Sequence, residues 1–193
     1  MKIIGITGVS GSGKTTISKM IQQQCEAEVV DADKIAKDLT QGDTEYLQEI
    51  VAEFGETILD ENHKLKRQEL ANIIFKDKAK KEKLDKLTQK YVVGEIKRRI
   101  EESKAQLIIL DVPLLFESKL NEICNITIGV IVNQQEEIKR ICARDNITVE
   151  QAIARLKNQH NNEFFIENCD YIVENTNLEK AQEELNKILL KLQ

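Results

Sequence analysis

Short, almost continuously apolar runs alternate along the chain with longer stretches of helical spacing. The runs include LIIL and IGVIV, and polar residues bound them on both sides. Strands of a parallel sheet show this pattern, because helices cover both of its faces. The pattern predicts five strands: Lys2–Thr7, Ala27–Asp31, Gln106–Asp111, Ile126–Val132 and Asp170–Glu174.

The segments between these runs place apolar residues three and four positions apart, as one face of an α-helix requires. The clearest series is Leu178, Ala181, Leu185, Ile188 and Leu192. Alternating strands and helices predict an α/β fold, a doubly wound five-stranded parallel sheet with right-handed crossovers. In such sheets, ligands bind beyond the carboxyl ends of the strands.

One region interrupts the alternation. Between Asp33 and Gln106, about seventy residues have mostly helical spacing and no clear strand, which is too long for a simple crossover. We therefore expect a single domain over residues 1–193 with an inserted helical subdomain at about 34–105. Such an insertion could hold the acceptor of a transferred group.

The stretch GVSGSGKTT, residues 8–16, lies between the first predicted strand and a helical segment. It matches G-x-x-x-x-G-K-[ST], the phosphate-binding loop. Glycines let backbone amides approach an anion, and the following helix adds the positive end of its dipole. Lys14 can reach the β- and γ-phosphates, and the Thr15 hydroxyl can ligate Mg²⁺. We expect ATP to be bound by Gly8, Ser10, Gly11, Ser12, Gly13, Lys14, Thr15 and Thr16.

Composition narrows the class of protein. The net charge of −5 provides no basic field for nucleic acid. Four scattered cysteines without a C-x-x-C pair are typical of reduced thiols in a cytoplasmic protein. No apolar run reaches the roughly 18 residues of a membrane span, and no signal peptide is visible. Composition does not predict the oligomeric state.

The phosphate loop alone does not separate a kinase from a switch GTPase or a transporter ATPase. A switch GTPase needs an Asn-Lys-x-Asp guanine reader, but Asn133-Gln134-Gln135-Glu136 follows IGVIV, and no LSGGQ-like signature is present. A small-molecule kinase needs a base, arginines for the transferring group and a mobile lid.

A base candidate lies in VVDADKIAKDL. Asp31 and Asp33 follow the second predicted strand, at the end of the sheet that also carries the phosphate loop. A carboxylate there can accept a proton from an acceptor hydroxyl or hold Mg²⁺ through water. The alternative is that Asp33 is the N-cap of a helix that starts at Lys34.

A lid candidate lies at about 137–168. Arg140 and Arg144 are four residues apart and so share a helix face. Asp145 is expected to end this helix, and Val149–Leu156 to form a second one. The alternative is an ordinary solvated basic face.

Six segments together resemble the dephospho-CoA kinase family over essentially the whole chain. They are GITGVSGSGKTT, VVDADKIAKDL, Lys66-Arg67, DVPLLFE, Arg140-x-x-x-Arg144-Asp145 and CDYIVENT, in that order. The resemblance implies that ATP donates its γ-phosphoryl group to the ribose 3′-hydroxyl of dephospho-CoA. It also implies roles for single residues: Asp33 as catalytic base, Arg67 as a contact to phosphates or acceptor, Leu115 and Phe116 as an apolar wall beside the acceptor, Arg140 and Arg144 in the lid, Asn175 beside the adenine of ATP, and Asp111 as a Walker B aspartate.

Two positions depart from the family pattern. Thr88-Gln89 stands where the family usually carries His-Pro, and Ala71 stands where a second arginine commonly follows Arg67. Lys66 or Arg98 could replace the missing cation. These departures leave two alternatives open: a kinase of nucleosides or nucleoside monophosphates, and a nucleotide-dependent switch or binding module.

Overall fold

The computed structural model describes residues 1–191, so Leu192 of the predicted last helix lies outside the described residues. The chain divides into two compact units. One contains the residues from Met1 to Val30 and those from Lys104 onward, and the other is Asp31–Ser103. Within residues 1–191, no helix combines the length and the apolar character needed to cross a membrane.

A five-stranded sheet with the order β2-β3-β1-β4-β5 lies at the centre of the fold. The β1–β3, β1–β4 and β4–β5 pairs are parallel. The five strands confirm the predicted ones, with ends that differ by no more than one residue: β1 (Lys2–Gly8), β2 (Ala27–Asp31), β3 (Leu107–Asp111), β4 (Ile126–Ile131) and β5 (Tyr171–Glu174).

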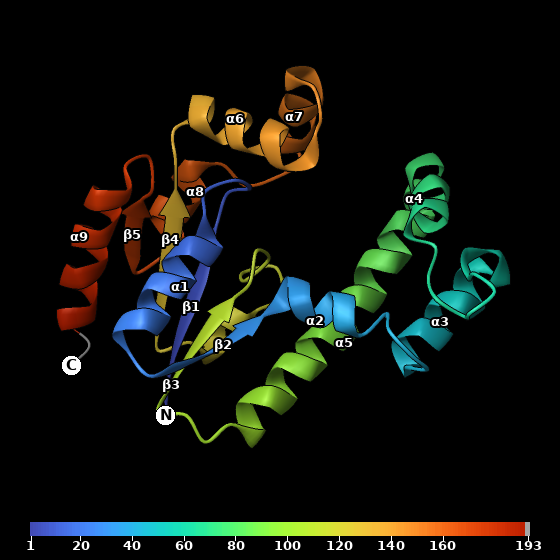
Figure 1. Cartoon of the computed structure of the whole chain (residues 1–193), viewed down its shortest axis with the longest axis horizontal. Coiled ribbons are helices and arrows are strands. Elements are labelled where there is room, and N and C mark those ends of the chain that lie inside the picture. Colours follow the sequence, from blue (N-terminus) through green and yellow to red (C-terminus); the bar gives the residue numbers. More distant parts are fainter. Residues whose placement is uncertain (192–193) are drawn as a thin grey trace. The chain divides into compact units, whose positions relative to one another are not determined.

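Helices cover both faces of this sheet. On one face, α1 (Lys14–Gln24) and α9 (Leu178–Leu190) pack together over Ile128 and Val130 of β4 (Figure 1). Gly129 points to the opposite face, since side chains alternate along a strand. There, a Cβ at Gly129 would lie 3.2 Å from the Cβ of Phe165 in α8 (Asn162–Asn168). The doubly wound α/β fold is therefore confirmed.

Two further helices follow β4, with boundaries set by local capping. Helix α6 (Gln134–Asp145) begins after Asn133, whose side chain accepts from the Glu136 amide, and ends at Asn146 with φ 52°. Helix α7 (Val149–Leu156) begins with a reciprocal capping box between Thr148 and Gln151. Both boundaries predicted here, the end at Asp145 and the span Val149–Leu156, are confirmed. A short 3-10 helix, η2 (Leu120–Ile123), precedes β4.

The second unit is helical and has its own core. Its elements are α2 (Ala32–Asp38), α3 (Glu45–Phe54), η1 (Glu56–Ile58), α4 (Arg67–Lys76) and the long α5 (Lys78–Glu102). Helix α5 packs against α2, α3 and α4. The core of this unit contains Tyr46, Ile50, Phe54, Ile58 and Leu70.

Candidate functional site

The phosphate loop connects the central strand β1 to helix α1, and its conformation depends on glycine. Gly11 and Gly13 have φ angles of 75° and 87°, in the left-handed region that favours glycine. A Cβ at Gly13 would also lie 2.3 Å from the side-chain nitrogen of Asn175. A side chain at position 13 would therefore both strain the backbone and displace Asn175.

The backbone of the loop leaves several donors available for an anion. Within the described residues, the amides of Gly11, Gly13 and Thr15 donate to no acceptor of the polypeptide, whereas the Ser12 amide donates to Val9 O at 3.2 Å. The Ser12 hydroxyl is buried and has no hydrogen-bond partner. Unsatisfied donors at a helix N-terminus form a cradle for anions. The loop therefore fits a phosphate group.

The polypeptide itself holds the charged side chain of the loop. The Lys14 ammonium donates to the backbone oxygens of Gly8 and Val9, both at 3.0 Å. These contacts keep the positive charge beside the first residues of the loop. A nucleotide phosphate bound at the amides meets a cation that is already in place.

Asp111 ends β3, beside Ile6 of β1. Its carboxylate is 4% exposed and accepts a hydrogen bond from the Ser18 hydroxyl at 3.0 Å. Ser18 lies three residues after Thr15 in α1, on the same side of the helix. The structure therefore places an acidic group one helical turn from the predicted metal ligand. No cluster of three potential metal-binding side chains occurs within residues 1–191.

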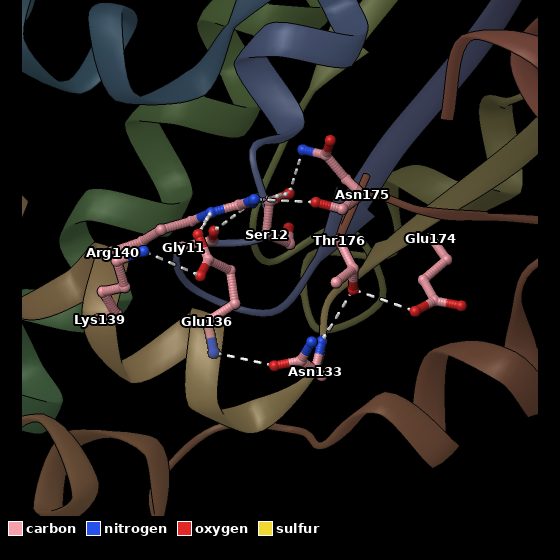
Figure 2. A network of polar contacts seen from close by, with 9 residues as sticks. All are labelled: Gly11, Ser12, Asn133, Glu136, Lys139, Arg140, Glu174, Asn175 and Thr176. Atoms are coloured by element: carbon pink, nitrogen blue, oxygen red, sulfur yellow. Dashed lines mark hydrogen bonds and ion pairs between the residues drawn. The ribbon is translucent and has the colours of Figure 1, made fainter. Parts of the chain in front are cut away.

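Arg140 of α6 connects three segments of the first unit (Figure 2). Its guanidinium donates to Asn175 O at 2.9 Å and to Gly11 O and Ser12 O, both at 3.4 Å. A further bond joins it to the Glu136 carboxylate at 3.1 Å, and this bond is the main cause of a lowered Glu136 pKa. Arg140 thus braces the phosphate loop against α6, and a solvated basic face does not describe it.

Asn175 follows β5 and is 4% exposed. Its side-chain amide donates to Ser12 O at 2.7 Å, the same loop carbonyl that Arg140 contacts (Figure 2). The residue was expected beside the adenine of ATP. Because the amide is buried and bonded to the loop, Asn175 here orients the phosphate loop.

Arg144 lies one turn further along α6 and is more exposed. Its guanidinium makes two bonds to the Asp145 carboxylate, at 2.8 and 2.9 Å, and one of 3.5 Å to the Ser10 hydroxyl. Arg155 of α7 binds the same carboxylate at 2.5 Å. These cations hold the pKa of Asp145 below its ordinary value, with Arg144 as the main cause. Asp145 therefore joins the two helices of the predicted lid.

Sequence reasoning missed Glu137, which lies beside the loop. The residue is 7% exposed, although it is a glutamate on a charged helix. A Cβ at Gly11 would lie 3.2 Å from its backbone oxygen, so this turn of α6 packs directly on the phosphate loop. Burial raises the Glu137 pKa to about 7, and the nearby Lys14 opposes the rise. The available signal was its position four residues before the buried Ile141, on the same face of the helix.

The predicted apolar wall needs one correction. Leu115 is fully buried, and a Cβ at Gly5 would lie 2.9 Å from its Cδ2 atom. Leu115 is therefore a core residue behind β1, because the loop after β3 turns this side chain inward. Phe116 is half-buried and packs edge to face on Phe164, with ring centroids 5.5 Å apart.

In the second unit, Asp31 is the N-cap of α2 and accepts from the Lys34 amide at 2.9 Å. The alternative that Asp33 is this N-cap is therefore wrong, since the helix begins at Ala32. Asp33 lies exposed in the first turn. Arg67, the first residue of α4, donates to the Thr40 hydroxyl at 2.7 Å.

The positions that depart from the family pattern also have structural partners. Thr88 forms a 2.7 Å hydrogen bond with the Tyr46 hydroxyl, inside the core of the second unit. Arg98, one of the two possible substitutes for the missing arginine, binds Glu95 at 2.8 Å and Glu102 at 2.5 Å. Arg98 is thus already paired with two carboxylates of its own helix.

The family model, the similar sequences and a similar solved structure all carry the same description. Residues 2–180 match the family model described as dephospho-CoA kinase. A dephospho-CoA kinase from Listeria monocytogenes is 40% identical over 188 residues, which cover 95% of this chain and 94% of the relative. One from Fusobacterium nucleatum is 40% identical over 92% of this chain and 91% of the relative. The solved structure of dephospho-CoA kinase from Campylobacter jejuni has a TM-score of 0.71 and 27% identity, over 100% of this chain and 98% of that one.

Proposed function

We propose a mechanism for this chain, which belongs to the dephospho-CoA kinase family. As a member of that family it is an ATP-dependent transferase that phosphorylates dephospho-CoA in coenzyme A biosynthesis. Our proposal concerns the acceptor atom and the residues that act on it. The ribose 3′-hydroxyl attacks the γ-phosphorus, the bond between the γ-phosphorus and the β,γ-bridging oxygen breaks, and ADP leaves.

The phosphate loop holds the donor. The amides of Gly11, Gly13 and Thr15 bind phosphate oxygens, and Lys14 stabilises the negative charge that develops on the transferring group. Bound Mg²⁺ would be held by the Thr15 hydroxyl and, through water, by Asp111, and it would neutralise charge on the β- and γ-phosphates. The observation that carries the proposal is the unsatisfied donor cradle beside an ammonium group that is already held in place.

The helical unit supplies the acceptor side of the reaction. Asp33 orients the hydroxyl and takes its proton as the new bond forms, a role open to an exposed carboxylate in the first turn of a helix. Arg67 binds the acceptor or its phosphates through guanidinium donors beyond the one used by Thr40. Phe116, a residue of the unit with the phosphate loop, is our candidate for the apolar wall of the acceptor site.

Helices α6 and α7 form the lid. We limit it to residues 134–161, because α8 packs on β4 and β1 through the buried Phe165. Arg140 and Arg144 lie on one face of α6, and both guanidinium groups already contact the phosphate loop, where they can bind the phosphates. Exclusion of water by the closed lid protects the phosphoryl group from hydrolysis. A cytoplasmic location remains a prediction from the cysteine pattern.

One assay tests the function. ADP formation from ATP and Mg²⁺ is followed with dephospho-CoA, with nucleosides or nucleoside monophosphates, and without an acceptor. We expect rapid ADP formation only when dephospho-CoA is the acceptor. One molecule of CoA should then form for each molecule of ADP. Faster turnover with a nucleoside would favour the other kinase class, and equal ADP formation without any acceptor would favour a nucleotide switch.

A further inference from the structure

One polar side chain lies on the buried face of helix α1. The buried residues of this helix are Ile17, Ser18 and Ile21, and Ser18 is 1% exposed. Both isoleucines belong to the apolar core that α1 forms with the sheet and α9. An alanine at position 18 would favour the helix more strongly and would not remove a hydroxyl group from water. The hydroxyl group of Ser18 therefore has a reason other than packing.

The Ser18 hydroxyl group has two acceptors, both at 3.0 Å: Lys14 O, one turn earlier in α1, and Oδ2 of Asp111. A hydroxyl group has a single proton and donates one hydrogen bond at a time. Lys14 O already accepts from the Ser18 amide, as the geometry of the helix requires. Hydrogen bonds to a carboxylate are about twice as strong as those between neutral groups. We therefore assign the proton of the hydroxyl group to the bond with Asp111.

Asp111 is the buried carboxylate at the end of β3. The residue is 4% exposed, and it pairs with Ile6 of the central strand. Rotation of an aspartate carboxylate about its Cβ–Cγ bond is broadly distributed unless a contact restricts it. The bond from Ser18 crosses from α1 to β3 and holds one of the two oxygens. It therefore fixes the carboxylate relative to the helix that begins at the phosphate loop.

Thr15 and Ser18 place two hydroxyl groups on one side of α1. The residues are three positions apart, so Thr15 lies about one turn closer to the phosphate loop. Thr15 is exposed at the start of the helix, whereas Ser18 is buried against Asp111. Mg²⁺ takes oxygen ligands and keeps several waters, which carboxylates outside the ligand shell orient. The outer hydroxyl group can therefore serve the metal directly, and the inner one serves the carboxylate.

The alternative is a buried serine whose hydroxyl group only satisfies itself on its own helix. Serines in helices often donate to the carbonyl group four residues earlier. Ser118 has this pattern: its hydroxyl group donates to Leu114 O and Leu115 O and, within the described residues, to no side chain. Ser18 differs because a buried carboxylate lies at hydrogen-bond distance. This contact carries the inference.

We propose that Ser18 is a positioning residue for the Mg²⁺ ion of phosphoryl transfer, and that it acts through Asp111. Its hydroxyl group holds the carboxylate in the orientation that accepts hydrogen bonds from metal-bound water. Without this bond the carboxylate rotates freely and holds the metal less tightly, while the amide donors of the phosphate loop stay in place. The inference rests on the proposed function, because it specifies how the same metal site is oriented.

Nucleotide affinity with and without metal measures this effect apart from catalysis. Ser18→Ala removes the hydroxyl group, and calorimetry measures binding of a non-hydrolysable ATP analogue in Mg²⁺ and in EDTA. We expect the affinity in Mg²⁺ to fall roughly 3- to 10-fold, less than the 10- to 100-fold typical of residues that contact metal ligands directly. The affinity in EDTA should not change, because the loop amides and Lys14 bind the phosphates without the metal.

Thr127→Val is the matched control, because it loses the same kind of contact elsewhere in the sheet. Thr127 is 6% exposed, and its hydroxyl group bonds to Oδ2 of Asp170 at 2.8 Å. It lies near the amino end of β4, whereas the phosphate loop follows the carboxyl end of the parallel strand β1. Both affinities of this variant should equal those of the wild type. A loss of affinity in Mg²⁺ as large as that of Ser18→Ala would show a general loss of stability and contradict the inference.

A double-mutant cycle with Asp111→Ala tests whether Ser18 acts through the carboxylate. In the Asp111→Ala protein, Ser18→Ala should have no further effect on the affinity in Mg²⁺, whereas the effects of independent sites add. Additive effects, equal losses in Mg²⁺ and EDTA, or an unchanged affinity in Mg²⁺ would overturn the inference. If Asp111→Ala does not fold, the comparison of Ser18→Ala in Mg²⁺ and EDTA decides. A wild-type protein that binds the analogue with Mg²⁺ but does not phosphorylate dephospho-CoA would contradict the proposed function alone.

Discussion

The two units hold their charged site residues in different ways. In the unit with the phosphate loop, the backbone engages the cations: Lys14 bonds to Gly8 and Val9, and Arg140 bonds to three carbonyl groups. In the unit Asp31–Ser103, the Asp33 carboxylate makes no hydrogen bond or ion pair within its own unit, and Arg67 has a single side-chain partner.

This difference indicates two levels of preorganisation. Donor groups around the phosphate loop are held before any ligand arrives, so their contribution does not require ordering of long side chains. Asp33 and Arg67 instead lie on helices of a unit with its own packed core. Both side chains are exposed. We therefore expect the first unit to determine nucleotide affinity and the second to determine transfer to the acceptor.

The largest effect is expected from the preorganised unit. Lys14→Ala should lower kcat by about 10³- to 10⁵-fold, the range for a cation that stabilises the transferring phosphoryl group. The protein should stay folded, since the exchange removes no core side chain. Steady-state turnover and thermal unfolding measure the two quantities. Lys19→Ala, at an exposed position of the same helix, is the control. A folded Lys14→Ala variant with normal turnover would contradict the phosphate-loop assignment.

Asp33→Asn tests the helical unit Asp31–Ser103. Loss of the proton acceptor should lower turnover by roughly 10²- to 10⁴-fold, while ATP affinity changes little. The comparator is Asp31→Asn, because Asn caps α2 about as well as Asp. CoA formation and ATP titration measure both effects. Near-normal CoA formation by Asp33→Asn would exclude the base, and a weakened affinity for Mg²⁺-ATP would instead assign Asp33 to the metal's outer shell.

Arg140→Ala examines the brace between lid and loop. We expect kcat/KM to fall roughly 10²- to 10³-fold, with a larger share of ATP hydrolysed without transfer. Arg144→Ala should have the smaller effect, because its guanidinium is more exposed and paired with Asp145. The ratio of CoA formed to ADP formed reports the coupling. If the ratio of CoA to ADP is the same in the wild type, Arg140→Ala and Arg144→Ala, α6 does not act as a lid.

Glu137→Gln tests stability in the first unit. The pKa of Glu137 is about 7 in the folded protein against 4.5 for an ordinary glutamate. The folded state therefore binds the proton more tightly, and this group destabilises the wild type increasingly as pH rises from 4.5 through 7. The variant should be more stable than the wild type at pH 8 and similar to it near pH 4. Denaturant unfolding at both pH values measures the difference in unfolding free energy between the variant and the wild type. A difference that does not depend on pH would contradict the prediction.

The smallest effect concerns the core of the second unit. Thr88→Val leaves the Tyr46 hydroxyl without its partner and should cost about 1–2 kcal/mol of unfolding free energy. Kinetic constants should change little if position 88 is structural here. A large rise in KM for dephospho-CoA with unchanged stability would instead place Thr88 at the acceptor.

Much of this protein is determined by its sequence alone. The order of strands and helices, the phosphate loop, the end of α6 at Asp145 and the span of α7 depend on short-range features. Apolar periodicity, glycine at positive φ angles and capping side chains act within a few residues of one another. A local pattern is therefore enough to predict them.

Other features were decided only by tertiary structure. Leu115 is buried and Asn175 is bonded to the loop because strands and loops distant in sequence meet there. The burial of Glu137 arises in the same way, from the packing of α6 on Gly11. Burial depends on which surfaces come together, and desolvation then sets the protonation of what they enclose. A short stretch of sequence does not show which distant residues will bury a side chain.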